Sequence, residues 1–331
     1  MATTVNSAFT EFLRDTVNLD NSQTQIARKS RDNLLSNIRL FSGDNDFFTI
    51  NGDRSLFFGS FARHTKLRPL DDIDIMICIS GSDDRPYTNA GNGTYYMGAN
   101  QTDIASGLNI YGTNCLNSTR VINRFISKLS ELNDYSKAEI HKNHEAATLK
   151  LKTYDWTFDI VPCFYCVGDF YLIPDGNGNW KKTDPRIDND RTTSINQSQN
   201  GNLLSLIRLV KYWNKRNNTI TISSYLLECM ILNRYDNKVA PEKWWIDLQF
   251  KDTLLYLSAA IYNSVIDPKG IQGDLNSYCY GDRVKISEAL KKAYYKAVEA
   301  FNLETNDNNQ KAAIKKWQEV LGVRFPNYTG A

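Results

Sequence analysis

The sequence predicts an α+β fold of two lobes, a strand-rich lobe over residues 1–195 followed by a helical lobe over 196–331. Short apolar stretches of strand length are confined to the first lobe, whereas from Leu203 onward apolar residues recur at helical spacing. Between these regions, residues 174–201 are rich in Gly, Asn, Asp and Ser. Such a composition is typical of a loop, so we place the boundary between the lobes there.

The elements of the first lobe can be predicted in order. Helical spacing over 7–42 indicates N-terminal helices that brace the lobe, and an apolar stripe predicts a further helix over 114–132. The predicted strands cover 55–58, 71–80, 138–152 and 156–166, and the last two form a hairpin. One segment, 82–107, is rich in Gly, Asn, Asp and Tyr without a regular period, which predicts a loop insertion.

Two carboxylates stand on the predicted strand 71–80. Side chains alternate along a strand, so Asp72 and Asp74 share one face while the isoleucines between and beyond them face a core. Neighbouring carboxylates repel one another, and a divalent cation between them relieves that repulsion. A third carboxylate, Asp159, lies in the apolar run WTFDIVPCF. Mg²⁺ is held by a few carboxylates, water and substrate phosphates, so these residues are candidate ligands for one or two metal ions.

A Gly-Ser pair precedes the carboxylates. Gly59 and Ser60 follow a short apolar strand, and eleven residues separate Ser60 from Asp72. Glycine allows the backbone to approach a phosphate, and the Ser60 hydroxyl can donate a hydrogen bond to it. Arg63 and Thr65 lie in the same connection and can add donors. A Gly-Ser turn and an Asp pair are each common alone, so the order of these features carries the interpretation.

The order Phe58-Gly59-Ser60, Asp72-Ile73-Asp74 and Asp159 resembles the nucleotidyltransferase superfamily with a polymerase-β-like palm. Further segments narrow the resemblance to the CD-NTases, the bacterial cyclic-oligonucleotide synthases related to cyclic GMP-AMP synthase. These segments are YLIPDGNGNWKKTDPR (171–186), IRLVKYWNKR (207–216), ISSYLLECMIL (222–232) and AIKKWQEVLGVRFP (313–326). The resemblance spans nearly the whole chain.

The resemblance implies a metal-dependent enzyme that joins nucleoside triphosphates into a cyclic di- or trinucleotide and releases pyrophosphate. Asp72, Asp74 and Asp159 would then be catalytic and would bind two Mg²⁺ or Mn²⁺ ions. The residues matching the family's triphosphate contacts in the helical lobe are Lys211 and Ser224, with Ser223 as the alternative in the same turn.

Four residues of the helical lobe each have two interpretations. Lys211 can be a solvated helix lysine, and Ser224 can be only an N-cap. Tyr225 can stack on a base or pack in the core. Glu228, one turn later, suits a buried salt bridge as well as a ligand role.

The net charge and the apolar content of the chain argue against long nucleic acid and the membrane as partners. The net charge is +2, which argues against binding long nucleic acid by electrostatics alone. No apolar run is long enough to span a membrane, and the N-terminus lacks a secretory signal pattern, so a cytoplasmic enzyme is expected.

The resemblance also implies a role in anti-phage (CBASS) signalling beside an effector that binds the product. The end of the chain, NYTGA, can serve a tail-mediated protein partner or simply fray.

Two other functions fit parts of the pattern. An RNA-tailing or other small-substrate nucleotidyltransferase would share the fold, although RNA-tailing enzymes usually have a more basic surface. A nucleotide-binding sensor without catalysis would have no use for three clustered carboxylates, so Asp72, Asp74 and Asp159 favour an enzyme.

Overall fold

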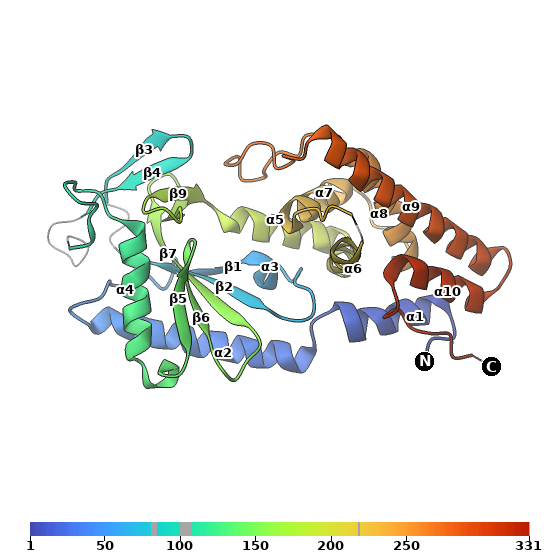
Figure 1. Cartoon of the computed structure of the whole chain (residues 1–331), viewed down its shortest axis with the longest axis horizontal. Helices are drawn as coiled ribbons and strands as arrows, with labels where there is room; N and C mark the ends of the chain where they lie inside the picture. The colour runs from blue at the N-terminus through green and yellow to red at the C-terminus, as the bar shows by residue number, and fades with distance from the viewer. Residues whose placement is uncertain (81–84, 100–106, 218, 331) are drawn as a thin grey trace. The chain divides into compact units, whose positions relative to one another are not determined.

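The computed structural model describes residues 1–80, 85–99, 107–217 and 219–330 (Figure 1). The chain forms two compact units. The sheet unit comprises 21–63 and 70–189, and the helical unit comprises 1–20, 64–69 and 190–331. This division places the first 20 residues with the C-terminal helices, whereas a single boundary after residue 195 would place them with the strands. The predicted α+β class is confirmed.

The sheet unit is built on a nine-stranded sheet. Seven of its strands follow the order β1-β2-β7-β8-β9-β4-β3. The other two branch from this path, because β6 pairs with β7 and β5 pairs with β6. The strands are β1 (Leu56–Phe58), β2 (Asp72–Cys78), β3 (Tyr87–Gly91), β4 (Thr94–Met97), β5 (Glu139–Asn143), β6 (Ala146–Lys150), β7 (Thr157–Cys166), β8 (Phe170–Pro174) and β9 (Trp180–Thr183). Only the β2–β7 pair is parallel among the pairings in the described residues.

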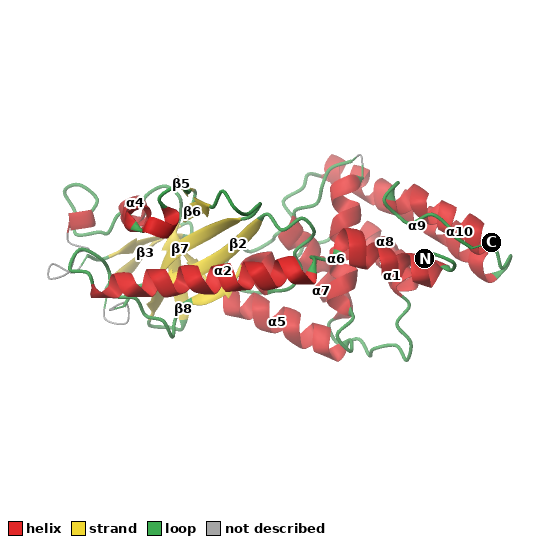
Figure 2. Cartoon of the chain, turned by 90° about the horizontal axis from the view of Figure 1, so that it is seen from below, coloured by secondary structure: helices red, strands yellow, loops and turns green. Residues whose placement is uncertain are grey.

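The two faces of the central strands have different neighbours. Ile73, Ile75 and Ile77 of β2 are buried on one face, as the alternating pattern predicts. The sheet unit also contains α2 (Asn21–Leu40), α3 (Gly59–Ala62) and α4 (Ser118–Glu131). Figure 2 shows α2 crossing the strands on one side of the sheet. After α2 the chain turns back, and Phe47 packs edge-on against Phe125 of α4, with ring centroids 4.9 Å apart.

A loop was predicted over 82–107, but β3 and β4 form a hairpin in the centre of this segment, so the prediction is wrong there. Residues 82–84 and 100–106 of the segment lie outside the described residues. The hairpin turns at Gly91 and Gly93, both with positive φ. Most of β3 is exposed, so its residues show no apolar alternation to indicate a strand.

The predicted loop over 174–201 is also wrong in part, because β9 and α5 (Pro185–Ser198) occupy most of it. Helix α5 begins at Pro185, a residue suited to the first helical turn, and continues through Asp, Asn, Thr and Ser. These residues have low helix propensity, so the composition indicated a loop. The predicted strand 138–152 is two strands, β5 and β6, joined at His144, whose φ is +48°.

The helical unit has a core of buried aliphatic and aromatic side chains from both ends of the chain. Its helices are α1 (Val5–Phe12), α6 (Leu203–Arg216), α7 (Ser224–Tyr235), α8 (Ile246–Ala260), α9 (Tyr280–Thr305) and α10 (Gln310–Leu321), with α5 entering from the sheet unit. Phe9 of α1 packs edge-on against Trp317 of α10, with centroids 4.9 Å apart, so the N-terminal helix lies beside the last one (Figure 1).

The short segment 64–69 belongs to the helical unit because hydrogen bonds fix it there. Arg208 of α6 donates to the backbone oxygen of His64 at 2.5 Å and to Asn18 Oδ1 at 2.7 Å. Arg68 donates to the backbone oxygens of Asn18 and Asp15, each at 2.8 Å. Burial lowers the pKa of Arg208 to about 10, so the guanidinium still carries its charge at neutral pH.

The tail is attached to the same unit. The Thr329 amide donates to the Ala2 oxygen at 3.1 Å, and Tyr328 packs against the core; Ala331 lies outside the described residues. Within the ranges given above, no helix is both long and apolar enough to cross a membrane.

Candidate active site

Three carboxylates predicted from the sequence are brought together on β2 and β7. These strands run parallel, and Asp74 lies in register beside Asp159. Neighbouring strands are about 4.8 Å apart, so the two side chains leave the sheet as immediate neighbours. Asp72 is two residues from Asp74 and therefore shares its face. All three residues are half-buried.

The carboxylate face continues into a small apolar cluster. Further along the same face, Met76 and Cys78 of β2 and Val161 and Cys163 of β7 are buried together. The carboxylates therefore stand at the end of an apolar surface, where water is partly excluded. Electrostatic interactions with a bound ion or phosphate are stronger there than in bulk water.

A threonine from the next strand holds one of these carboxylates. Thr148 on β6 is in register with Asp159, and its hydroxyl donates to Asp159 Oδ1 at 2.6 Å. The Thr148 side chain is buried, so the bond fixes the orientation of the carboxylate. Sequence analysis missed this residue. The signal was available, because Thr148 lies in the predicted strand that pairs with the strand of Asp159.

The Gly-Ser turn lies directly against Asp74. β1 ends at Phe58, which is in register with Asp74, and α3 begins at Gly59. Gly59 has a φ of +71°, and a Cβ added there would lie 2.6 Å from Asp74 Cγ. Glycine is thus required both by the backbone conformation and by the approach of the carboxylate. Ser60, the next residue, is half-buried and is the second residue of this short helix.

The donors fit a hard divalent cation, although they do not form a complete cage. Within the described part of the chain, no group of three His, Cys, Asp or Glu side chains is already arranged to hold a metal ion. Mg²⁺ commonly uses only one or two protein carboxylates, and water and substrate phosphates complete its six oxygen ligands. Two adjacent Asp carboxylates and a third on the same face match that chemistry.

The two other residues predicted in the connection after Ser60 lie in different units. Arg63 caps the C-terminus of α3, where its amide donates to the Gly59 oxygen at 3.2 Å. Thr65 is fully buried in the helical unit, and its hydroxyl donates to Glu228 Oε1 at 3.0 Å. The Thr65 hydroxyl is therefore committed to a protein partner in this structure.

Lys211 on α6 is buried as well. Its ammonium forms an ion pair with Glu228 of α7 at 2.6 Å and donates to the Thr65 oxygen at 3.0 Å. The structure thus adopts the salt-bridge interpretation of Glu228. Helix α6 is amphipathic as predicted, but Lys211 lies within its buried side rather than at a solvated edge. A role for Lys211 in binding nucleotide remains a prediction.

Two serines and a tyrosine open α7. Ser223 is the N-cap, and its hydroxyl accepts from the Leu226 amide at 3.4 Å; Ser224 is the first helical residue. Both serines are exposed, so their hydroxyls are accessible to an anionic ligand. Tyr225 is half-buried, and its hydroxyl donates to Asp267 Oδ1 at 2.9 Å. The Lys269 ammonium lies 4.1 Å from the centre of its ring.

Tyr225 has two partners, Asp267 and Lys269, and sequence analysis missed both of them. They stand in the turn Asp267-Pro268-Lys269-Gly270, whose turn-forming residues were a visible signal. Asp267 pairs with Lys269 at 3.0 Å and accepts from the backbone amides of Lys269 and Gln272. Burial opposes the charge, but these hydrogen bonds outweigh it and hold the pKa of Asp267 below its usual value.

Comparison with known proteins identifies the family. No protein-family model matches the chain. The chain is 42% identical to a probable cyclic nucleotide synthase of Bacillus cereus (strain VD146), over 99% of both sequences. It is 29% identical to a cyclic AMP-AMP-AMP synthase of Acinetobacter, over 59% of this chain and 57% of that protein.

Solved structures agree in fold. CdnC of E. coli MS115-1, determined with ATP, superposes with a TM-score of 0.67 at 18% identity, over 97% of this chain and 99% of CdnC. DncV of Vibrio cholerae, a cyclic AMP-GMP synthase, superposes with a TM-score of 0.58 at 15% identity, over 83% of this chain and 70% of DncV. The near-complete match to the Bacillus relative, joined to this fold, shows that the chain belongs to the CD-NTase family of cyclic-oligonucleotide synthases and is a nucleotidyltransferase.

Proposed function

We propose that the enzyme is metal-dependent and joins nucleoside triphosphates into a cyclic di- or trinucleotide, releasing pyrophosphate at each bond formed. The observation that carries this proposal is the register of Asp74 with Asp159, with Asp72 on the same face and the Gly59-Ser60 turn against Asp74. A cluster of carboxylates beside a Gly-Ser turn suits phosphoryl transfer, in which positioning and charge neutralisation supply most of the catalysis.

The proposed metal ligands are Asp72 and Asp74 for two Mg²⁺ or Mn²⁺ ions, with Asp159 as a further ligand of one of them. When bound, such ions neutralise the triphosphate and favour ionisation of an attacking hydroxyl. The chain's own residues orient the reactants. Asp159, whose carboxylate accepts a hydrogen bond from Thr148, would accept or orient the proton of an acceptor ribose hydroxyl.

In the proposed reaction, the ribose oxygen of one nucleotide forms a bond to the α-phosphorus of another. The bond from that phosphorus to the bridging oxygen of the β-phosphate breaks, and pyrophosphate leaves with the electron pair. The backbone at Gly59 and the Ser60 hydroxyl would orient the donor phosphates. Arg63, Thr65, Lys211, Ser223, Ser224 and Tyr225 remain predicted nucleotide contacts, although the Thr65 hydroxyl donates to Glu228 in this structure.

The test of this function is a product assay. The pure protein is incubated with α-³²P-labelled NTPs and Mg²⁺ or Mn²⁺, treated with phosphatase, and the products are separated. We expect a phosphatase-resistant product that requires the added metal and is lost in the Asp72→Asn/Asp74→Asn variant. Omission of single NTPs then identifies the bases. A linear product, recognised because phosphatase removes its terminal phosphates and changes its mobility, or label transferred only to added RNA, would replace the proposal with an RNA-tailing or other small-substrate activity.

The biological setting is also a proposal. We propose a cytoplasmic enzyme of anti-phage (CBASS) signalling whose cyclic product activates a separate effector. The relatives named as cyclic nucleotide synthases support a cyclic nucleotide product, and one CdnC structure contains a HORMA partner. A plaque assay with the gene and its genomic neighbours tests this role. Protection that survives in the Asp72→Asn/Asp74→Asn variant would contradict it, and co-purification with and without residues 327–331 tests a tail-mediated partner.

A further inference from the structure

The connection from α8 to α9, residues 261–279, has no helix or strand of its own, and the structure describes all of it. It is nevertheless held firmly. The Asn276 side-chain amide donates to two backbone oxygens at the start of the connection, each at 2.8 Å. The Arg283 guanidinium of α9 donates to three more of its backbone oxygens at 2.8 to 2.9 Å. Long connections without secondary structure are usually either disordered or functional, and these bonds favour a functional one.

The connection contacts the N-cap of α7. The Ser223 amide donates to the Tyr278 hydroxyl at 3.1 Å, and this hydroxyl donates to the backbone oxygen of Thr221 at 3.0 Å. One hydroxyl thus joins two backbone groups that lead into the helix. Because the Tyr278 ring packs against the core of the helical unit, the position of the hydroxyl is fixed.

A second contact reaches the same helical turn two residues later. The Tyr225 hydroxyl donates to Asp267 Oδ1 at 2.9 Å, and the Lys269 ammonium lies 4.1 Å from the centre of the Tyr225 ring. Asp267 and Lys269 form an ion pair of 3.0 Å, and each side chain is less than a tenth exposed. The Asp267 carboxylate also accepts from the amides of Lys269, Ile271 and Gln272. The connection therefore fixes the carboxylate, and the carboxylate fixes the tyrosine.

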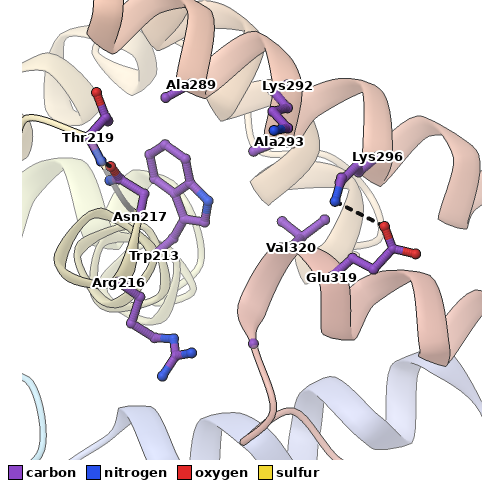
Figure 3. Close-up of a pocket in the computed structure, with 11 residues that line it drawn as sticks. Trp213, Arg216, Asn217, Thr219, Ala289, Lys292, Ala293, Lys296, Glu319 and Val320 are labelled. Carbon is purple, nitrogen blue, oxygen red and sulfur yellow. Dashed lines mark hydrogen bonds and ion pairs between the residues drawn. The ribbon is translucent and has the colours of Figure 1, made fainter.

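The chain that enters α7 is also fixed from α6. Asn214 of α6 donates to the Ile222 oxygen at 2.8 Å and accepts from the Ile222 amide at 3.0 Å. Asn217 Oδ1 accepts from the Thr219 amide at 3.0 Å, and Figure 3 shows these two residues together at the wall of a cavity beside Trp213. The first turn of α7 is thus held from α6 as well as from the α8–α9 connection.

This first turn carries three of the predicted nucleotide contacts, Ser223, Ser224 and Tyr225. The two serines are exposed, so they can meet a ligand without displacing a protein side chain. Groups that are already ordered lose less conformational freedom when a ligand binds, and affinity rises accordingly. The contacts that order this turn are therefore expected to affect nucleotide binding without touching the nucleotide.

We propose that Tyr278 and Asp267 are positioning residues for nucleotide binding. Tyr278 fixes the backbone at Ser223, and Asp267 fixes the Tyr225 side chain, so that the first turn of α7 is preorganised for the nucleotide. The inference rests on the proposed function, because it requires that this turn contacts a nucleoside triphosphate. It adds the α8–α9 connection, which lies outside the predicted site, to the elements that set nucleotide affinity.

The test measures the Kd of nucleotide for the full-length protein by isothermal titration calorimetry with Mg²⁺. The probes are the four α,β-methylene NTPs, which cannot release pyrophosphate, and variants are compared with the probe that the wild type binds most tightly. Tyr278→Phe removes only the bridging hydroxyl, and Asp267→Asn removes the charge that accepts from Tyr225. We expect each variant to raise Kd about two- to tenfold, as for the loss of a hydrogen bond.

Double variants distinguish positioning from a purely structural role. If Tyr278 acts through the turn, Tyr278→Phe/Ser224→Ala should raise Kd by less than the product of the two single effects. The same holds for Asp267→Asn/Tyr225→Phe. A purely structural role would lower the stability of the variant and leave its Kd unchanged. Tyr280→Phe, which removes a hydroxyl from an exposed tyrosine at the start of α9, is the control and should keep the wild-type Kd.

The outcomes separate this inference from the proposed function, provided that circular dichroism verifies the fold of each variant. An unchanged Kd in Tyr278→Phe or Asp267→Asn overturns the role of that residue, and so do independent effects in its double variant. An unchanged Kd in both Ser224→Ala and Tyr225→Ala overturns the whole inference, although a cyclic product would still support the proposed function. Absence of saturable binding of every probe by the wild type would contradict both.

Discussion

The Lys211 ammonium and the Glu228 carboxylate lie 2.6 Å apart in the interior of the helical unit, and Thr65 contacts both of them. Each charged side chain is less than a tenth exposed. The pair joins α6 to α7 and fixes the segment 64–69 to both helices. A residue that resembles a phosphate-binding lysine is thus also part of the structural core of its unit.

Removal of one partner should be more costly than removal of both. Lys211→Met leaves the Glu228 carboxylate buried without its cation, so we expect a loss of about 3–5 kcal/mol in the free energy of unfolding. The Lys211→Met/Glu228→Leu variant should lose less than Lys211→Met alone, because no buried charge remains. Urea denaturation measures all of these values. Lys215→Met, an exposed lysine on the same helix, is the control and should change little.

The same double variant separates structure from nucleotide binding. If Lys211 contacts the triphosphate, the folded double variant should show a raised KM for NTP. An unchanged KM would assign the lysine to stability alone. Ser60→Ala is a useful comparison, because its predicted role in holding the donor phosphates raises KM without loss of stability.

Loss of Asp74 or Asp159 should abolish synthesis while the fold remains. We expect Asp74→Asn and Asp159→Asn each to lower the rate of product formation by at least about a hundredfold, because a charge that acts in the transition state is lost. Thermal unfolding should change little, since removal of one of two adjacent carboxylates relieves repulsion. Asp71→Asn, the exposed neighbour that precedes β2, is the matched control. A strong loss of activity in Asp71→Asn would show that the effect is not specific to the clustered carboxylates.

Gly59→Ala should affect both stability and activity. The substitution forces a residue with a side chain into φ +71° and places its Cβ against Asp74. Gly93→Ala has a similar φ of +77° but no atom within 4 Å of the added Cβ, so it measures backbone strain alone. We expect Gly93→Ala to cost about 1–2 kcal/mol and Gly59→Ala to cost at least about 1 kcal/mol more. Urea denaturation and the product assay compare them, and equal costs would disprove the close approach to Asp74.

Asp267→Ala should destabilise the protein in a pH-dependent way. The folded-state pKa of Asp267 is lowered, so its contribution to stability is complete above its unfolded value of 3.8 and is lost as the pH falls through the folded value. At pH 7 we expect a loss of about 1.5–3 kcal/mol from hydrogen bonds to a charged group. The difference from wild type should stay constant between pH 7 and pH 5 and shrink below pH 3.8. A difference that grows on acidification would contradict the assignment.

The candidate active site was largely predictable because its residues lie on strongly patterned elements. The alternation around Asp72 and Asp74 indicates a strand and its faces directly, and β2 is found where it was predicted. The pairing of Asp74 with Asp159 could not be predicted from the local sequence, because neither strand specifies a partner strand 85 residues away. Only the resemblance to a known family placed the third carboxylate beside the first two.

Polar elements were the ones that local sequence could not predict. Strand β3 is mostly exposed, and α5 is composed of residues that favour turns, so neither shows an apolar period. The environment of Lys211 was also hidden, because its partners Thr65 and Glu228 reach it through tertiary packing. Helical spacing predicted the buried side of α6 but could not show that a carboxylate would be buried with the lysine.

The contact of Phe9 with Trp317 has a consequence for how the protein is made on the ribosome. The first helix emerges early in translation, but its packing partner is synthesised about 300 residues later, which takes tens of seconds at typical elongation rates. During that interval the sheet unit can fold while the N-terminal segment waits, with Phe9 and Phe12 exposed. The core of the helical unit is therefore completed only after Trp317 has been synthesised, and Phe9 lacks this aromatic partner until then.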